Sequence, residues 1–426
     1  MKIVILAVGS QGDVQPYAAL GRGLARAGHA VSLASHETFR PLAKRCGIDF
    51  SLIAGNPVDI VQGPEGQSWL SSSGSYVSFL SRARKMAATL YPQMSRDALA
   101  ASRGADALIF SLPLTICGFS VARALRIPGI PAALYPLHPT RAFPSIMTPS
   151  LSAGRAANWL SGTGVMILYW SIARSLLREF HKAEGLGGLP LPAPLKAMER
   201  AGLPFLYGYS PSVMQRPPGW PASRVVGGYW FLEDSPDWKA EPRLADFLQK
   251  GPEPLYVGFG SMTSGNPQEM TRAVLEAIKR TGQRAVMSTG WGGFGASDLP
   301  PSVLPIGFVP HDWLFARVSM AIHHGGAGTT AAVLKAGAPS IIVPFFADQF
   351  FWGKRICDLG VGPSPIPRKD LTADSLEKAI RAVLENPSMT TQARDLAASI
   401  KAEDGVAAAV DAVEVYLRSM TRRRMA

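Results

Sequence analysis

Residues 323–330 read His-His-Gly-Gly-Ala-Gly-Thr-Thr, between an apolar run that predicts a buried strand and a segment that predicts a helix. The glycines predict a turn, and we expect the helix to begin at Thr329. Backbone N–H groups in the first turn of a helix have no partner within it, and the helix dipole adds partial positive charge there. A diphosphate is therefore expected to bind at the backbone of Gly326, Gly328 and Thr329. His324 would donate one more hydrogen bond to it.

A second polar pair, Asp348 and Gln349, follows the next apolar run of the chain, which predicts another buried strand. A carboxylate and an amide side by side offer both acceptors and donors, and these suit the hydroxyl groups of a sugar. A diphosphate loop followed by a hydroxyl-binding pair is the pattern expected of a nucleotide-sugar site.

Near the N-terminus, residues 9–16 read Gly-Ser-Gln-Gly-Asp-Val-Gln-Pro, between an expected strand and an expected helix. In open α/β folds, ligands bind at the carboxyl ends of the strands, where this segment would lie. Asp13 could accept a proton from a hydroxyl group as a general base, with Ser10 and Gly12 close to the reacting groups. In the alternative, structural interpretation, Asp13 caps the helix and Pro16 occupies an early helical position.

The elements that must position these residues alternate between strand and helix. The region 136–188 is an exception: it has no strand signal and a long amphipathic stretch, which predicts loops and helices around an acceptor cleft. Alternation of this kind predicts parallel sheets covered by helices on both faces. Strands are expected at 2–7, 31–34, 107–110, 255–259 and 320–323, and helices at 14–27, 38–46 and 405–418.

Proline is frequent between residues 210 and 243, which predicts a linker between two domains. A chain of 426 residues is long enough for two domains that each have their own core. We expect an N-terminal domain at 1–215, a linker at 216–242, a C-terminal domain at 243–405 and a last helix at 406–426.

The composition, 47% hydrophobic and 17% charged, is typical of a well-buried globular protein. The cysteines Cys46, Cys117 and Cys357 are widely spaced, which argues against a zinc site or a disulfide framework and fits a cytoplasmic protein. The first apolar run is too short for a signal peptide, and later runs are too short or too interrupted to span a bilayer. No metal site is expected.

The net charge of +12 is concentrated in residues 1–215, which contain 20 Lys and Arg against 10 Asp and Glu. Two interpretations stay open: a solvated basic surface, or peripheral docking onto an anionic membrane. The sequence shows no nucleic-acid-binding module and no interleaving of basic and aromatic residues, so no nucleic-acid partner is expected.

The segments 323–329 and 9–16 together resemble the signatures of the family 1 glycosyltransferases. The resemblance is to the branch that holds the sterol glucosyltransferases and the bacterial antibiotic glycosyltransferases, and it extends to both ends of the chain. It implies the GT-B fold, an α/β fold in which two Rossmann-like, doubly wound domains face each other across a cleft. The last helix would pack back on the N-terminal domain.

The resemblance also implies roles for single residues. Asp13 would be the catalytic base, and Ser261 would lie against the diphosphate. Phe308 would stack on the nucleotide base, and Val309 would hydrogen-bond to it through its backbone. Trp291, in a glycine-rich loop, would cover the nucleotide.

The implied reaction is the inverting, metal-independent transfer of a hexose, without a cofactor, to a hydroxyl group of a hydrophobic acceptor. The expected donor is UDP-glucose, and the expected acceptor is a sterol, hopanoid, polyketide or polyphenol that becomes a β-glycoside. Plant relatives carry a ribose-binding glutamate eight residues after the diphosphate-binding histidine, and Ala332 stands at that position here. The ribose contact is therefore unassigned, which leaves a dTDP-sugar donor open.

Four alternatives stay open at this point. The chain could be a dTDP-deoxysugar transferase, or a non-catalytic auxiliary protein that binds a nucleotide sugar. A nucleotide-sugar epimerase or phosphorylase would need further acid or base residues near Asp13, which the sequence does not show. A dinucleotide-dependent oxidoreductase would use Glu37 as its ribose-binding acid, but the glycines lack the G-x-G-x-x-G spacing.

Overall fold

The computed structural model describes residues 1–55, 76–148, 154–186, 202–232, 238–260, 267–288, 299–345 and 348–425, which form two α/β units. The first unit holds the described residues up to Leu232 together with those from Glu403 onward, and the second holds those between 238 and 402. Residues 216–232, which we expected to form a linker, therefore belong to the first unit.

The first unit is built on a seven-stranded sheet with the order β3-β2-β1-β4-β5-β6-β7, and every pair of neighbours is parallel. In this register, Ile3 of β1 lies opposite both Val31 of β2 and Ala107 of β4. The central strands are continuous apolar runs because helices cover both faces of the sheet. The strands are β1 Lys2–Leu6, β2 Ala30–Ser35, β3 Asp49–Leu52, β4 Ala107–Phe110, β5 Gly129–Ala133, β6 Phe205–Tyr207 and β7 Arg224–Val226.

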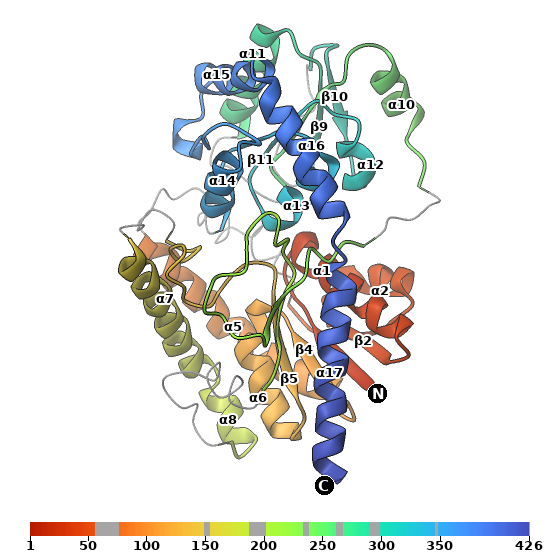
Figure 1. The fold of residues 1–426 in the computed structure, drawn as a ribbon, viewed down its shortest axis with the longest axis vertical. Coiled ribbons are helices and arrows are strands. Elements are labelled where there is room, and N and C mark those ends of the chain that lie inside the picture. Colours follow the sequence, from red (N-terminus) through yellow and green to blue (C-terminus); the bar gives the residue numbers. More distant parts are fainter. Residues whose placement is uncertain are drawn as a thin grey trace. The chain divides into compact units, whose positions relative to one another are not determined.

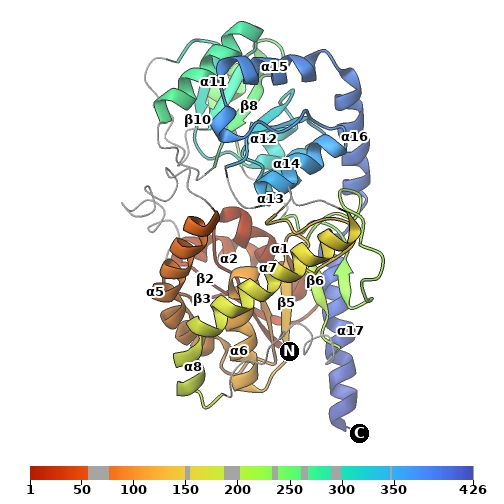
Figure 2. The same cartoon turned by 90° about the vertical axis from the view of Figure 1, so that its left-hand side faces the viewer.

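Helices α1, α2 and α17 lie on one side of this sheet, and α5, α6 and α7 lie on the other (Figures 1 and 2). The described residues between 136 and 186 contain helices and loops and no strand, as predicted. No described helix combines the length and the apolar character needed to cross a membrane. The helices are α1 Gln11–Arg26, η1 Glu37–Phe39, α2 Arg40–Cys46, α5 Tyr76–Ser102, η2 Leu112–Leu114, α6 Thr115–Leu125, α7 Arg155–Leu176, α8 Arg178–Ala183 and α17 Gly405–Met425.

The last helix, α17, is part of the core of the first unit, where it packs on α1 and β7. Val413 is fully buried in the cluster that surrounds β1 and α1. The close approach depends on a small residue: a Cβ atom at Gly23 of α1 would lie 2.4 Å from Cγ1 of Val406. A larger side chain at position 23 would push α17 away from the unit.

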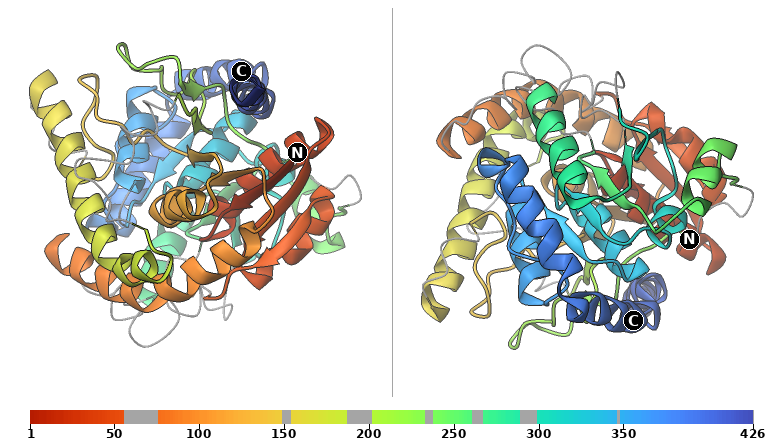
Figure 3. Two further views of the ribbon diagram at one scale, coloured as in Figure 1. Left: turned by 90° about the horizontal axis from the view of Figure 1, so that it is seen from below. Right: turned by 90° about the horizontal axis from the view of Figure 1, so that it is seen from above.

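The second unit is built on a five-stranded parallel sheet with the order β10-β9-β8-β11-β12. His323 of β11 lies opposite Gly258 of β8 and Ile342 of β12. Helices α11 and α15 pack side by side on this sheet (Figure 3, right). The elements are β8 Leu255–Gly258, β9 Ala285–Ser288, β10 Val303–Ile306, β11 Ala321–His323, β12 Ser340–Ile342, α10 Pro242–Gln249, α11 Pro267–Thr281, α12 His311–Phe315, α13 Ala327–Ala336, α14 Gln349–Asp358, η4 Arg368–Asp370, α15 Ala373–Leu384 and α16 Pro387–Lys401.

In each sheet the order reverses between two neighbouring strands, β1 and β4 in the first unit and β8 and β11 in the second. Loops leave such a point in opposite directions and open a crevice at the carboxyl ends of the strands, where ligands bind. Asp13 lies after β1, and His324 lies after β11. Each predicted motif is therefore at the switch point of its own sheet, and the predicted α/β class with two doubly wound sheets is confirmed.

Candidate active site

In the first unit, Asp13 lies in the first turn of α1, directly after the loop that follows β1. Ser10 is the N-cap residue and Asp13 is the third residue of the helix, so the interpretation in which Asp13 is itself the cap is wrong. Oδ2 of Asp13 accepts hydrogen bonds from the backbone N and from Oγ of Ser10, both at 2.8 Å. Oδ1 accepts no hydrogen bond from the residues that the structure describes. One carboxylate oxygen thus holds the side chain, and the other can serve a ligand.

Gly9 makes this position of Asp13 sterically feasible. Its φ of +132° belongs to a region that other residues rarely adopt. A Cβ atom at Gly9 would lie 2.6 Å from Oδ2 of Asp13 and 2.9 Å from its Cγ. Any side chain at position 9 would therefore displace the carboxylate.

Burial raises the pKa of Asp13 above its ordinary value, although the hydrogen bonds from Ser10 lower it in part. A raised pKa increases the affinity of the carboxylate for a proton, which suits a general base. Tyr17, one turn further along α1, is 2% exposed and donates a hydrogen bond to the carbonyl oxygen of Ala132 at 2.9 Å. Burial and the nearby Asp13 carboxylate raise the pKa of Tyr17, so its hydroxyl stays protonated.

In the second unit, the loop between β11 and α13 carries the residues for which we predicted diphosphate binding. The helix begins at Ala327 after the N-cap Gly326, so Gly328 and Thr329 lie within its first turn, two residues earlier than expected. The first hydrogen bond of the helix runs from N of Thr330 to O of Gly326, at 2.9 Å. The preceding N–H groups have no acceptor within the helix and lie at its positive end, an arrangement that suits an anion.

His324 follows β11 and lies against two glycines. A Cβ atom at Gly326 would be 2.5 Å from Nε2 of His324, and one at Gly260 would be 3.2 Å from its Cε1. Burial, together with the nearby imidazole of His311, lowers the pKa of His324 to about 4. The ring is therefore neutral at pH 7 and carries one N–H donor without a positive charge. A hydrogen bond with the backbone of Gly258 raises the pKa in part, so this backbone group competes with a phosphoryl oxygen for the N–H.

The segment after β12 lies beside this loop. A Cβ atom at Gly325 would be 3.1 Å from the carbonyl oxygen of Gln349. Oε1 of Gln349 accepts a hydrogen bond from N of Phe345 at 2.7 Å, and the residue is 4% exposed. Oδ2 of Asp348 accepts a hydrogen bond from Nε1 of Trp352 at 3.1 Å. Both residues are thus brought to the predicted site, but each uses one side-chain oxygen to hold the beginning of α14.

Phe308 and Val309 follow β10 and differ sharply in exposure. Phe308 is 78% exposed, the most exposed large hydrophobic side chain in the described part of the chain. Val309 is half-buried against the cluster that contains Ile306 and Leu314. An aromatic ring that stays in solvent beside a packed neighbour is available to stack on a flat ligand.

The strand order arranges these residues in a row. All five strands are parallel, so the loops after them leave the sheet at the same edge. In the order of the strands, the row runs from Phe308 after β10 to Gly260 after β8, His324 after β11 and Asp348 after β12. Neighbouring strands are about 4.8 Å apart, so the row spans about 19 Å.

Ser261, directly after Gly260, and Trp291, after β9, lie outside the described residues, and the predictions about them stay predictions. Sequence reasoning did not identify the roles of Gly9, Gly260 and Tyr17. The sequence did show a glycine at the end of an apolar run near each candidate site residue. The role of such a glycine depends on which side chain packs against it, and this contact is visible only in the structure.

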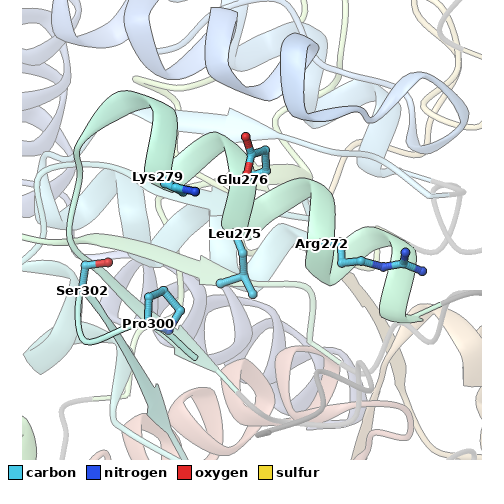
Figure 4. A pocket seen from close by; sticks show the side chains of 6 residues that line it. All are labelled: Arg272, Leu275, Glu276, Lys279, Pro300 and Ser302. Atoms are coloured by element: carbon cyan, nitrogen blue, oxygen red, sulfur yellow. The ribbon is translucent and has the colours of Figure 1, made fainter. Parts of the chain in front are cut away.

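A surface depression of about 480 Å³ on the second unit does not belong to this row (Figure 4). Pro300 and Ser302 line it and precede β10, which places them at the amino end of that strand, away from Phe308. The remaining lining residues, Arg272, Leu275, Glu276 and Lys279, come from α11. In the described part of the chain, no three His, Cys, Asp or Glu residues are grouped as metal ligands.

Two family models match the chain. The glycosyltransferase family 28 N-terminal domain matches residues 3–144, and the erythromycin biosynthesis protein CIII-like C-terminal domain matches residues 285–414. The first match contains Asp13, and the second contains Phe308, His324, Asp348 and Gln349, but not Gly260.

Among curated proteins, the chain is 38% identical over 428 residues to the sterol 3-beta-glucosyltransferase of Aspergillus clavatus, which covers 97% of this chain and 29% of that protein. It is 37% identical over 430 residues to the sterol 3-beta-glucosyltransferase UGT80B1 of Arabidopsis thaliana, which covers 98% of this chain and 68% of that protein. The chain thus spans about a third of the length of the fungal relatives that it matches, 29% in the first case.

Among solved structures, the glycotransferase of kitacinnamycin superposes with a TM-score of 0.71 at 17% identity, over 97% of this chain and 98% of that one. The glycosyltransferase VinC, in complex with dTDP, superposes with a TM-score of 0.65 at 19% identity, over 98% of this chain and 100% of that one. At these identities the two structures support the fold.

Proposed function

Because this chain belongs to the GT-B glycosyltransferases, in the branch that contains the sterol glucosyltransferases and the bacterial antibiotic glycosyltransferases, we propose that it transfers a hexose from a nucleotide sugar to a hydroxyl group of a hydrophobic acceptor. UDP-glucose is the donor that we expect, and the product would be a β-glycoside. The row that runs from Phe308 to Asp348 along one edge of the second sheet is the observation that carries the proposal.

The row matches the parts of a nucleotide sugar in their covalent order. The base would stack on the exposed ring of Phe308, with the backbone of Val309 as its hydrogen-bonding partner. The diphosphate would accept hydrogen bonds from His324 and from the first turn of α13. The hexose would then reach Asp348 and Gln349, whose carboxylate and amide groups would bind its hydroxyl groups.

In the proposed reaction, Oδ1 of Asp13 accepts the proton of the acceptor hydroxyl while the oxygen of that hydroxyl attacks the anomeric carbon. The new carbon–oxygen bond forms on the face opposite the diphosphate as the bond to the diphosphate oxygen breaks, so the configuration inverts. The electron pair of the broken bond stays on the diphosphate. His324 and the N-terminus of α13 would stabilise that charge, and the proposal therefore assigns no step to a metal ion.

A sterol or a similar hydroxylated lipid is the acceptor class that we propose. The relatives from Aspergillus clavatus and Arabidopsis thaliana are sterol 3-beta-glucosyltransferases, which supports a sterol. The buried apolar residues that this unit holds between 136 and 180, such as Ile146, Trp170 and Phe180, support a hydrophobic aglycone.

A dTDP-sugar donor is the second candidate. Ala332 stands where plant relatives carry the glutamate that binds the ribose hydroxyls, and its methyl group packs against the apolar cluster around Val333. Because Ala332 has no carboxylate, this position does not select a ribose over a deoxyribose. The dTDP-sugar would occupy the same row of residues.

The test is to incubate the purified protein with UDP-glucose or dTDP-glucose and a panel of sterols and other hydroxylated lipids. Mass spectrometry would detect the hexose adduct, and the coupling of the anomeric proton in an NMR spectrum would report its configuration. Asp13→Asn should lower turnover by about 100-fold or more, because one proton acceptor is lost. Asp411→Asn, on the exposed side of α17, is the matched control and should keep full turnover.

Each outcome has a defined meaning. A β-glucoside that depends on Asp13 would support the reaction and the base together, and the preferred nucleotide would identify the donor. Tight binding of UDP with no adduct from any acceptor would support the non-catalytic alternative. An α-glycoside would contradict the inverting reaction, and failure to bind either nucleotide would contradict the assignment of the row.

A further inference from the structure

Helix α7 (Arg155–Leu176) presents large apolar side chains to solvent. Trp159, Leu160, Ile167 and Leu168 are 45%, 61%, 51% and 39% exposed. They are four of the ten large hydrophobic residues that are exposed in the described part of the chain. Isolated exposed hydrophobic residues are ordinary, but a concentration on one helix marks an interaction surface.

Leu160, Ile167 and Leu168 lie on the outward face of the helix, whereas Trp159 is exposed at its N-terminal end. Its inner face is buried at Asn158, Gly162, Trp170 and Ala173, and a Cβ atom at Gly162 would lie 2.9 Å from Cα of Pro139. The outward stripe follows helical spacing, from Leu160 through Gly164, Ile167 and Ser171 to Arg174. Within the first unit, α7 is a peripheral helix whose neighbours are α5 and α8 (Figures 1 and 2).

The hydroxyl groups on or beside this face are already satisfied within the helix. Oγ1 of Thr163 donates to the carbonyl oxygen of Trp159 at 2.9 Å, and Oγ of Ser171 donates to that of Ile167 at 2.8 Å. Hydroxyls that are bonded back to the helix cost little to remove from water. The face therefore has few polar groups that would hydrogen-bond to a protein partner, whose interface needs about one hydrogen bond per 100–200 Å².

Cations flank the apolar residues at both ends of the helix. Arg155 begins α7, Arg174 lies near its end, and Arg178 and Lys182 follow on α8; all four are exposed. Helix α7 contains no acidic residue, and Glu179 is the acidic residue within α8. An apolar face with cations at its edges and a tryptophan at one end complements a lipid surface with anionic headgroups.

We propose that the outward face of α7 docks the first unit peripherally onto an anionic lipid bilayer. Leu160 and Ile167 enter the boundary between headgroups and acyl chains, while the arginines at the two ends of the helix face the anionic headgroups. Docking needs neither a donor nor an acceptor, so it is independent of the proposed reaction. It would bring the unit that carries Asp13 to the surface in which a sterol-like acceptor is dissolved.

The test is co-sedimentation of the full chain with vesicles of phosphatidylcholine alone, or of equal parts of phosphatidylcholine and phosphatidylglycerol, over a series of salt concentrations. The unmodified chain should bind the anionic vesicles, and added salt should weaken this binding. Ile167→Glu should lower the affinity by about ten-fold or more, since it places a carboxylate in the headgroup region. Val415→Glu, at a 68% exposed position of α17, is the matched control and should change the affinity by less than about two-fold.

Circular dichroism would verify that both variants are folded. Equal binding by Ile167→Glu and Val415→Glu would overturn the proposal, as would equal binding to neutral and anionic vesicles or no binding at all. A dimer that Ile167→Glu dissociates, without vesicle binding, would assign the face to self-association instead. Activity on a detergent-dispersed acceptor should survive Ile167→Glu; its loss while vesicle binding persists would assign the face to the acceptor site and overturn the proposal.

Discussion

Oδ2 of Asp13 accepts two hydrogen bonds from Ser10, one from the backbone N and one from Oγ, each 2.8 Å long. The two residues are the N-cap and third helical positions of α1, so their contact stabilises the start of the helix. The same contact orients the carboxylate and leaves Oδ1 for a ligand. The capping contact between Ser10 and Asp13 is therefore compatible with a role of Asp13 as general base, because each uses a different oxygen of the carboxylate.

Gly9→Ala is expected to lower turnover strongly without weakening donor binding. A Cβ atom at position 9 would be 2.6 Å from Oδ2 of Asp13, so the carboxylate must move. We expect kcat to fall by about 100-fold, as for a displaced general base. The control is Gly28→Ala, which also has a positive φ, +89°, but has no atom within 4 Å of an added Cβ. Both variants should lose about 1 kcal/mol of stability; equal loss of kcat in both would show that contact with Asp13 is not the cause.

The second unit is expected to lose stability in mild acid because of His324. In the unfolded chain this histidine titrates near 6.5, whereas burial and His311 lower the pKa in the folded unit to about 4. Between these values the unfolded state binds more protons, so the free energy of unfolding falls as the pH decreases from 6.5 towards 4 and is fully present above 6.5. In urea titrations without nucleotide, the free energy of unfolding should decrease between pH 7 and pH 5 in both proteins. The decrease should be about 1 to 2 kcal/mol smaller in His324→Gln than in the unmodified chain. The same pH dependence in both proteins would contradict the lowered pKa.

Phe308→Ala is expected to weaken the binding of UDP without destabilising the fold. The ring is 78% exposed, so its removal should change the free energy of unfolding by less than about 0.5 kcal/mol. Loss of stacking on the base should lower the affinity for UDP by about 5- to 100-fold in isothermal titration calorimetry. Phe308→Trp should keep the affinity, and Leu384→Ala, at a 44% exposed position of α15, is the control. An unchanged affinity for UDP in Phe308→Ala would show that the ring does not contribute to nucleotide binding.

Val413→Ala and Val415→Ala measure how strongly α17 stabilises the first unit. The two valines are two positions apart on the same helix, but Val413 is fully buried and Val415 is 68% exposed. Val413→Ala removes buried methyl groups and leaves a cavity, so the free energy of unfolding should fall by about 2 kcal/mol. Val415→Ala should change it by less than about 0.5 kcal/mol. Equal effects in chemical denaturation would show that the packing of α17 contributes little.

Local patterns in the sequence were sufficient to predict most of the secondary structure. The strand predicted at 107–110 is β4, and the helix predicted at 14–27 is α1 with an earlier start, at Gln11. The start of α13 was missed by two residues because Gly326, and no residue with a capping side chain, is its N-cap. Such boundaries depend on hydrogen bonds that a sequence pattern does not specify.

The contacts and the exposure of individual side chains were harder to predict. Asp348 and Gln349 were predicted as sugar contacts from their types alone, yet one oxygen of each holds the beginning of α14. The region of helix α7 was predicted to be amphipathic, but the helix carries large apolar side chains on both its inner and its outer face. Its sequence therefore does not reveal that Leu160 and Ile167 lie in solvent. Which face of such a helix is buried depends on contacts such as that of Gly162 with Pro139, which are distant in the sequence.

The sequence by itself determined the class of the fold and the two glycine-containing motifs, because strand–helix alternation and turn-forming residues act over a few neighbouring positions. Only the tertiary structure decided that Phe308, Gly260, His324 and Asp348 form one row. Their order depends on β8 pairing with both β9 and β11, and such pairing between distant strands is selected by the packing of the whole core. The chemistry of the site is thus local in the chain, whereas its geometry is a property of the sheet.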